Sequence, residues 1–235
     1  MGSLIQYVWI DNRKEKAIGV VFDSTNRIHR LLLKPYMKFP ESDKRYSKNM
    51  YNMPIKDEWF VFWGGTNEFI NYHYAYQSQR YAYDLVIMKD NQTYQDNPMQ
   101  NENYYAFNRE VVAPAHGKVI KVVNHIEDNV PGEMDDTQPA GNYIVLEHPN
   151  KEYSFLAHFK QHSIVVKEGE IVQQGQRVGL CGNSGNSSEA HIHFQVMDSP
   201  DYTNCQSIRI RFSDGEEPIQ GDIVTPFGLK NKMDV

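Results

Sequence analysis

Short runs of apolar residues, many of them alternating with polar ones, recur along the chain and predict β-strands. Apolar positions at helical spacing do not persist beyond about a dozen residues anywhere. The runs are rich in β-branched and aromatic residues and are bounded by Gly, Pro, Asn and Asp, as strands commonly are. The predicted strands cover residues 4–10, 17–22, 28–33, 57–63, 82–88, 117–123, 143–147, 153–158, 176–181, 191–197 and 207–212. We therefore expect a mainly β protein.

The density of these runs divides the chain into three expected parts. Residues 1–65 are expected to form an N-terminal β-rich extension, residues 66–200 a β domain, and residues 201–235 a C-terminal tail that packs on that domain. The segments 91–108 and 129–140 hold few apolar residues. They are interpreted as surface insertions between strands.

Closely spaced glycines refine the expected fold. Gly169, Gly175 and Gly179 stand among β-branched residues, where glycine suits tight reversals and strands that pass close together. Glycines at such short intervals are typical of a folded-over hybrid of barrel and sandwich. Ordinary hairpins in any β-sandwich would give a similar pattern.

Composition narrows the classes of function. The 235 residues carry a formal net charge of -6, which argues against a nucleic-acid partner. Two cysteines, Cys181 and Cys205, allow one disulfide or two free thiols. No apolar stretch is long enough to span a membrane, and the N-terminus lacks the pattern of a signal peptide. We expect a soluble chain, extracytoplasmic if an export signal has been removed; the oligomeric state stays open.

The most informative motif is the histidine pair His191 and His193. In a strand, residues i and i+2 project from the same face, so both imidazoles point the same way. Two such imidazoles can both bind a metal ion, or one can bind it while the other moves a proton. Ile192 and Phe194 then face the opposite way, into a core. The small-residue loop 182–188, which leads into this strand, leaves room for a polymer.

Two upstream strands carry further candidates. His158 stands near the end of a predicted strand, where a side chain reaches a groove. Asp84 is a single acid in an apolar strand, where an unpaired carboxylate would be costly. It either pairs with Arg80 or serves as a metal ligand, for which aspartate oxygens are suited.

Together these segments resemble the lysostaphin/LytM family of zinc endopeptidases over residues 70–197. The matching motifs occur in the same order along the chain. They are the VxAPxxGxV-like run at 111–119, GNYIVLEH at 141–148, Tyr-x-x-x-x-His at 153–158, the glycine-punctuated run from 166, and GNSGNSSEAHIHFQV at 182–196. The resemblance implies a zinc-dependent peptidase that acts on peptidoglycan or on glycine-containing peptides.

The same resemblance implies roles for individual residues. His193 and Asp84 would be zinc ligands, while His158 and His191 would handle the proton of the attacking water and stabilise the oxyanion. The family usually has a ligand histidine four residues before the aspartate. That position is Arg80 here, and a guanidinium cannot bind zinc.

We hypothesise that His73, in the polar segment that precedes Asp84, replaces the missing ligand. The alternative is that Arg80 fills the metal position. The protein would then be a non-catalytic relative that binds peptide or cell wall, or that regulates a partner.

Overall fold

A computed structural model describes residues 4–231 of the chain, and β-strands make up most of its regular structure. The strands are β1 (Ile5–Ile10), β2 (Lys16–Phe22), β3 (Ile28–Pro35), β4 (Trp59–Trp63), β5 (Tyr83–Val86), β6 (Glu110–Val112), β7 (Gly117–Val123), β8 (Asn142–His148), β9 (Glu152–Phe159), β10 (Ile171–Val172), β11 (Arg177–Leu180), β12 (Ile192–Met197), β13 (Ser207–Ile208), β14 (Ile223–Thr225) and β15 (Gly228–Asn231). The helical segments are α1 (Pro40–Asp43), η1 (Tyr72–Ala75), η2 (Asn101–Asn103) and η3 (Pro149–Lys151).

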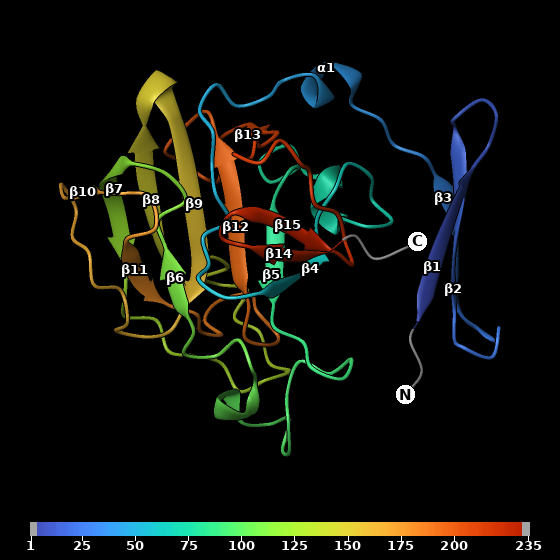
Figure 1. The fold of residues 1–235 in the computed structure, drawn as a ribbon, viewed down its shortest axis with the longest axis horizontal. Helices are drawn as coiled ribbons and strands as arrows, with labels where there is room; N and C mark the ends of the chain where they lie inside the picture. Colours follow the sequence, from blue (N-terminus) through green and yellow to red (C-terminus); the bar gives the residue numbers. More distant parts are fainter. Residues whose placement is uncertain (1–3, 232–235) are drawn as a thin grey trace.

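The main body is an antiparallel 10-stranded sheet with β12 near its middle (Figure 1). Its strand order is β10-β7-β8-β9-β12-β5-β4-β14-β15, and β13 pairs with β12 off this path. A second, two-stranded sheet joins β6 to β11. Ile192 and Phe194 on β12 are fully buried in the core. Their neighbours on the strand therefore lie on the other face of the sheet.

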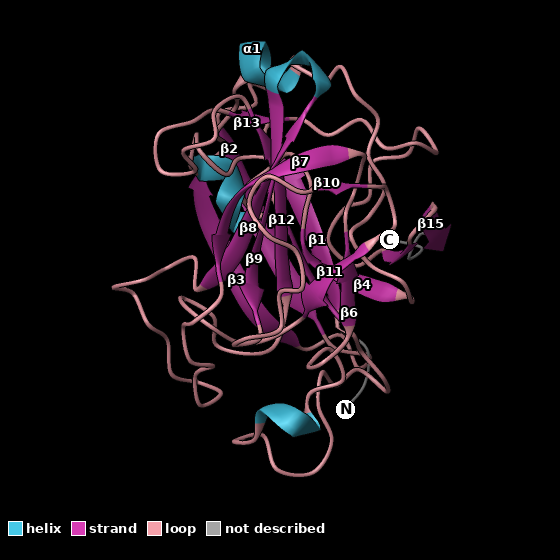
Figure 2. Ribbon diagram, turned by 90° about the vertical axis from the view of Figure 1, so that its left-hand side faces the viewer, coloured by secondary structure: helices cyan, strands magenta, loops and turns pink. Residues whose placement is uncertain are grey.

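Figure 2 shows that strands predominate in the molecule and that its helical segments are short. The expected mainly β fold is confirmed, and its sheets are antiparallel. The sheets of residues 4–231 do not close into a barrel. Within the same range, no helix has the length and apolarity needed to cross a membrane.

Several local expectations differ from the structure. The end of the segment 91–108 is not a surface insertion, because Tyr104, Ala106 and Phe107 are buried in the core. Beyond the predicted strand 207–212 the tail adds β14 and β15, which the sequence did not predict and which extend the main sheet beside β4. Both cysteines are free thiols. The division at residues 65 and 200 stays a prediction.

The first three strands form a separate antiparallel sheet, which lies at one side of the molecule in Figure 1. It is held through one face. Gln6 donates a hydrogen bond to the carbonyl of Phe69 at 2.8 Å, and Lys34 forms a 2.5 Å ion pair with Glu68. A side chain at Gly19 would collide with the Phe69 ring, which explains the glycine there.

Candidate metal centre and flanking histidines

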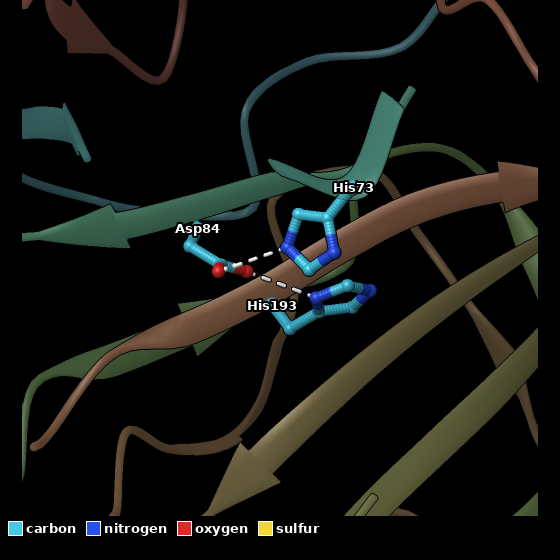
Figure 3. A group of neighbouring side chains, drawn as sticks. All are labelled: His73, Asp84 and His193. Carbon is cyan, nitrogen blue, oxygen red and sulfur yellow. Dashed lines mark hydrogen bonds and ion pairs between the residues drawn. The ribbon is translucent and has the colours of Figure 1, made fainter. Parts of the chain in front are cut away.

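Three buried side chains form a group that could hold a metal ion: His73, Asp84 and His193 (Figure 3). One possible ligand atom from each lies within 4.8 Å of the others. Nε2 of His73 lies 2.9 Å from Oδ2 of Asp84, and Nδ1 of His193 lies 2.9 Å from Oδ1 of the same carboxylate. The carboxylate thus stands between two imidazole nitrogens.

Strand pairing and one helical turn bring the three together. Asp84 on β5 is directly opposite His193 on β12, and opposed residues of antiparallel strands project from the same face. His73 lies in η1, and the backbone N–H of His73 donates a hydrogen bond to the side chain of Asn71. The amide of Asn71 donates to the carbonyl of Ala82. This bond ties η1 to the segment just before β5.

Two glutamine side chains determine which imidazole nitrogen carries a proton. Nδ1 of His73 donates to Oε1 of Gln79 at 2.6 Å, and Nε2 of His193 donates to Oε1 of Gln195 at 3.0 Å. In the neutral form of each ring the other nitrogen then carries a lone pair. Those are the two nitrogens that lie 2.9 Å from the Asp84 oxygens. Without a metal ion, a proton on each of these nitrogens would bond to the carboxylate. With a metal ion, the two lone pairs and the carboxylate oxygens would all point at it, so the donor set fits a metal ion.

The electrostatics of the group favour the forms that a metal requires. Burial raises the pKa of the Asp84 carboxyl, but the neighbouring histidines outweigh it and hold that pKa well below its usual range. Burial lowers the pKa of His73. A deprotonated carboxylate and a neutral imidazole are the states that bind metal ions.

His191 and His158 lie next to this group, with ring centres 4.6 Å apart. Nδ1 of His191 donates to the carbonyl of Glu189 at 2.9 Å, and Nδ1 of His158 donates to the carbonyl of Ser184 at 2.8 Å. Each ring therefore keeps Nε2 as its acceptor, and Nε2 of His191 lies 3.9 Å from Oδ1 of Asp84. Burial and the nearby His191 hold the pKa of His158 well below its usual value.

A β-bulge in β9 determines the position of His158. The register pairs Asn142 with Phe159 and Tyr143 with Ala157, which leaves His158 as the extra residue of a β-bulge. Its φ is +66°, in the left-handed region where such bulges usually place glycine. A non-glycine residue held there at a cost is a common feature of functional sites.

The loop 182–188 is a packed support for these histidines, a different role from the expected opening for a polymer. Ser184 and Ser187 are buried, and the Oγ of Ser187 lies 3.0 Å from Nδ1 of His191. Gly185 has a φ of +80°, and a side chain there would collide with the backbone of Gly141. Glycine thus lets the loop press against the segment before β8.

Arg80 does not take the place of a ligand. Its Nε donates to the carbonyl of Tyr74 at 3.0 Å, and its guanidinium lies over the ring of Phe39 at 3.4 Å. Pairing of Arg80 with Asp84, the structural alternative raised by the sequence, is therefore wrong: the carboxylate faces histidines instead. Reasoning from the sequence missed Gln79 and Gln195, whose amides fold back onto ligand candidates nearby in the chain.

Part of the chain matches the model of a known protein family. Residues 103–208 match the model of peptidase family M23. This part of the chain is similar to peptidase family M23. His158, His191 and His193 lie within the M23 match, whereas His73 and Asp84 precede it. The resemblance to lysostaphin and LytM-type peptidases is thereby confirmed.

Curated relatives of this chain include two proteins of Vibrio cholerae serotype O1. The chain is 40% identical over 58 residues to peptidoglycan DD-endopeptidase ShyA and 33% identical over 87 residues to peptidoglycan DD-endopeptidase ShyB. These matches cover 25% and 37% of this chain but only 13% and 17% of the relatives. The matched part is therefore less than a fifth of either relative.

Among solved structures, the chain is similar to the catalytic domain of lysostaphin from Staphylococcus simulans. The likeness has a TM-score of 0.37 at 20% sequence identity. It covers 65% of this chain and 88% of the lysostaphin domain.

Proposed function

We propose that this protein is a zinc-dependent endopeptidase that cleaves peptide bonds in peptidoglycan or in glycine-containing peptides. His73, Asp84 and His193 would hold the zinc ion, and His158 and His191 would handle protons. The observation that carries the proposal is the convergence of three acceptor atoms within 4.8 Å. The outer nitrogens of the two histidines are committed to glutamine carbonyls, so the inner ones are available to a metal.

The donor set suits zinc. Catalytic zinc is commonly held by three protein ligands of nitrogen and oxygen type, with a fourth position left for water or substrate. Zinc held there would polarise a peptide carbonyl and lower the pKa of water.

The flanking histidines supply the proton chemistry. His158 and His191 each donate through Nδ1 to a backbone carbonyl, which leaves Nε2 to accept a proton. The low pKa of buried His158 keeps that acceptor neutral. A ring that has taken the proton of the attacking water can return it to the departing amine. The paired position of the rings, 4.6 Å apart, supports a division of these two steps between them.

Exposure indicates where a substrate would approach. The side chain of His191 is 14% exposed, whereas those of Asp84 and His193 are each 7% exposed and that of His73 is 1% exposed. A peptide would therefore meet the group from the side of His191.

The substrate class is inferred from the relatives. The V. cholerae proteins that the chain resembles are named peptidoglycan DD-endopeptidases, and the M23 match includes three of the five proposed site residues. We infer an extracytoplasmic place of action, since that is where peptidoglycan lies.

The proposal is tested by zinc content and by hydrolysis of purified peptidoglycan fragments and of a pentaglycine peptide, followed by mass spectrometry. We expect zinc-loaded protein to cleave one of these and chelator-treated protein to cleave neither. His191→Asn should keep zinc and lose cleavage, while His125→Asn, at an exposed position, should keep both. Zinc-loaded protein that binds the fragments without cutting them would instead favour a binding or regulatory module.

A further inference from the structure

One face of the N-terminal sheet, formed by β1, β2 and β3, is apolar. The contacts described above that hold this sheet to the loop before η1 are made by its other face. Residues directly opposite one another in antiparallel strands project from the same face. The register of β1 with β2 and of β2 with β3 therefore aligns three rows of side chains on one face. These rows are Trp9, Ile18 and Leu33; Tyr7, Val20 and Leu31; and Ile5, Phe22 and Ile28.

All nine side chains of these rows are apolar or aromatic. The rings of Tyr7 and Trp9 stack at 5.5 Å, and Tyr7 meets the edge of Phe22 at 5.9 Å. The outer members remain open to solvent, and their exposed fractions run from 41% to 67%. They are Ile5, Tyr7, Trp9, Ile28, Leu31 and Leu33. Large side chains gathered on one exposed face usually mark an interaction surface.

The opposite face of the same sheet already has a partner. Gly19 meets the ring of Phe69, and Lys34 pairs with Glu68. Both contacts come from residues whose strand positions alternate with those of the apolar face. The sheet is thus fixed to the loop before η1 by one face and presents the other outward.

We propose that this apolar face binds the same face of a second copy of the chain. With about 200 Å² for a fully exposed large side chain, the six outer members leave on the order of 600 Å² to bury per copy. Two copies then bury about 1,200 Å², the lower end of specific protein interfaces. Two sheets of this kind pack face to face about 10 Å apart.

Self-association fits the face better than a lipid surface. The nine positions include no charged side chain. The same register places Lys16 opposite Pro35 next on this face, at its exposed edge. Pairing of the nine positions with themselves therefore buries no unmatched charge. A two-fold interface needs such self-complementarity. A lipid-binding face is usually rimmed by basic residues, but the turn between β1 and β2 mixes both signs. Its charged residues are Asp11, Arg13, Lys14 and Glu15.

The test is sedimentation velocity of the full chain over about 1 to about 100 µM. The wild-type protein should sediment as a dimer at the upper end and dissociate on dilution. Leu31→Lys and Leu33→Lys, at exposed positions, should each weaken the dimer by at least about tenfold. Phe227→Lys, at an exposed apolar position outside the face, should behave as the wild type. Circular dichroism establishes that each variant is folded.

Two results would overturn the proposal. The first is a wild-type protein that stays monomeric throughout the series, whatever the variants do. The second is a dimer that Leu31→Lys and Leu33→Lys, both folded, leave unchanged. In parallel, the protein is spun with vesicles of phosphatidylglycerol and phosphatidylethanolamine. A monomer that binds these vesicles and loses binding on Leu31→Lys would assign the face to lipid instead. Neither measurement depends on peptidase activity.

Discussion

The side-chain carbonyl of Gln195 lies 3.0 Å from Nε2 of His193, two residues earlier on the same strand. The amide nitrogen of Gln195 donates to the carbonyl of Ser78, also at 3.0 Å, so the orientation of the amide is fixed. His193 must then donate through Nε2 and direct the lone pair of Nδ1 towards Asp84. Gln195 is thus a positioning residue for a ligand candidate.

Removal of that carbonyl should weaken zinc binding. We expect Gln195→Leu to lower the affinity about 10- to 100-fold, the usual effect of losing a partner that orients a ligand. Gln195→Glu keeps an acceptor at the same place and should retain most of the affinity. Competition with a chelator of known affinity measures both. An unchanged affinity in Gln195→Leu, equal to that of the exposed control Gln174→Leu, would show that the bond does not orient the ligand.

Arg80 should affect stability and leave zinc content unchanged. The side chain is buried, stacks on Phe39 and donates to Tyr74. We expect Arg80→Met to lower the free energy of unfolding by about 1–3 kcal/mol, since it loses a buried hydrogen bond and a cation–π contact. Urea unfolding and metal analysis measure the two effects. Loss of zinc from a folded Arg80→Met protein would instead place Arg80 at the metal centre.

Because of the bulge at His158, glycine should give a more stable protein than alanine at this position, the reverse of the usual order in a strand. Glycine in a strand is ordinarily less stable than alanine, but a φ of +66° penalises any side chain. We expect His158→Gly to be more stable than His158→Ala by about 1 kcal/mol. Both should lose hydrolysis, because neither offers a proton acceptor. The opposite ranking in thermal or urea unfolding would mean that the left-handed backbone is not kept.

His148 should make stability depend on pH. Burial lowers its pKa in the folded state, and the ring is held between the carbonyl of His116 and the hydroxyl of Ser154. The unfolded chain, with a histidine pKa of about 6.5, therefore takes up the proton first as the pH falls. This contribution to stability is complete above about pH 6.5 and is lost as the pH falls through the folded pKa.

Substitution isolates the contribution of His148. The drop in unfolding free energy between about pH 7.5 and pH 5 should be smaller in His148→Gln than in the wild type. The exposed control His125→Gln should keep the wild-type slope. Equal slopes in all three proteins, measured by urea unfolding at fixed zinc, would contradict the assignment.

The sequence predicted the parts of the site that follow from local periodicity. His191 and His193 were placed on one face of a strand because the side-chain period of a strand is two, and buried Ile192 and Phe194 between them agree with that alternation. His73 was proposed because Arg80 cannot bind a metal and because the polar segment that holds His73 lies close before Asp84 in the sequence. The structure places His73 2.9 Å from Asp84, while its role as a ligand stays a prediction.

Features that depend on distant segments could not be predicted from local patterns. The bulge at His158 arises from its register with β8, and its Nδ1 partner Ser184 comes from a loop 26 residues away. The stacking of Arg80 on Phe39 joins the segment before β5 to the residue just before α1. Neither contact follows from the local pattern of the segments that it joins.

The central claim is that His73 supplies the ligand missing at position 80, and metal analysis of His73→Ala tests it directly. Wild-type protein purified with zinc should carry about one ion per chain, close to His73, Asp84 and His193 in an anomalous-scattering map. His73→Ala should lose most of that zinc and remain folded, while His162→Ala, at an exposed position, should keep it. Stoichiometric zinc retained by folded His73→Ala would contradict the account.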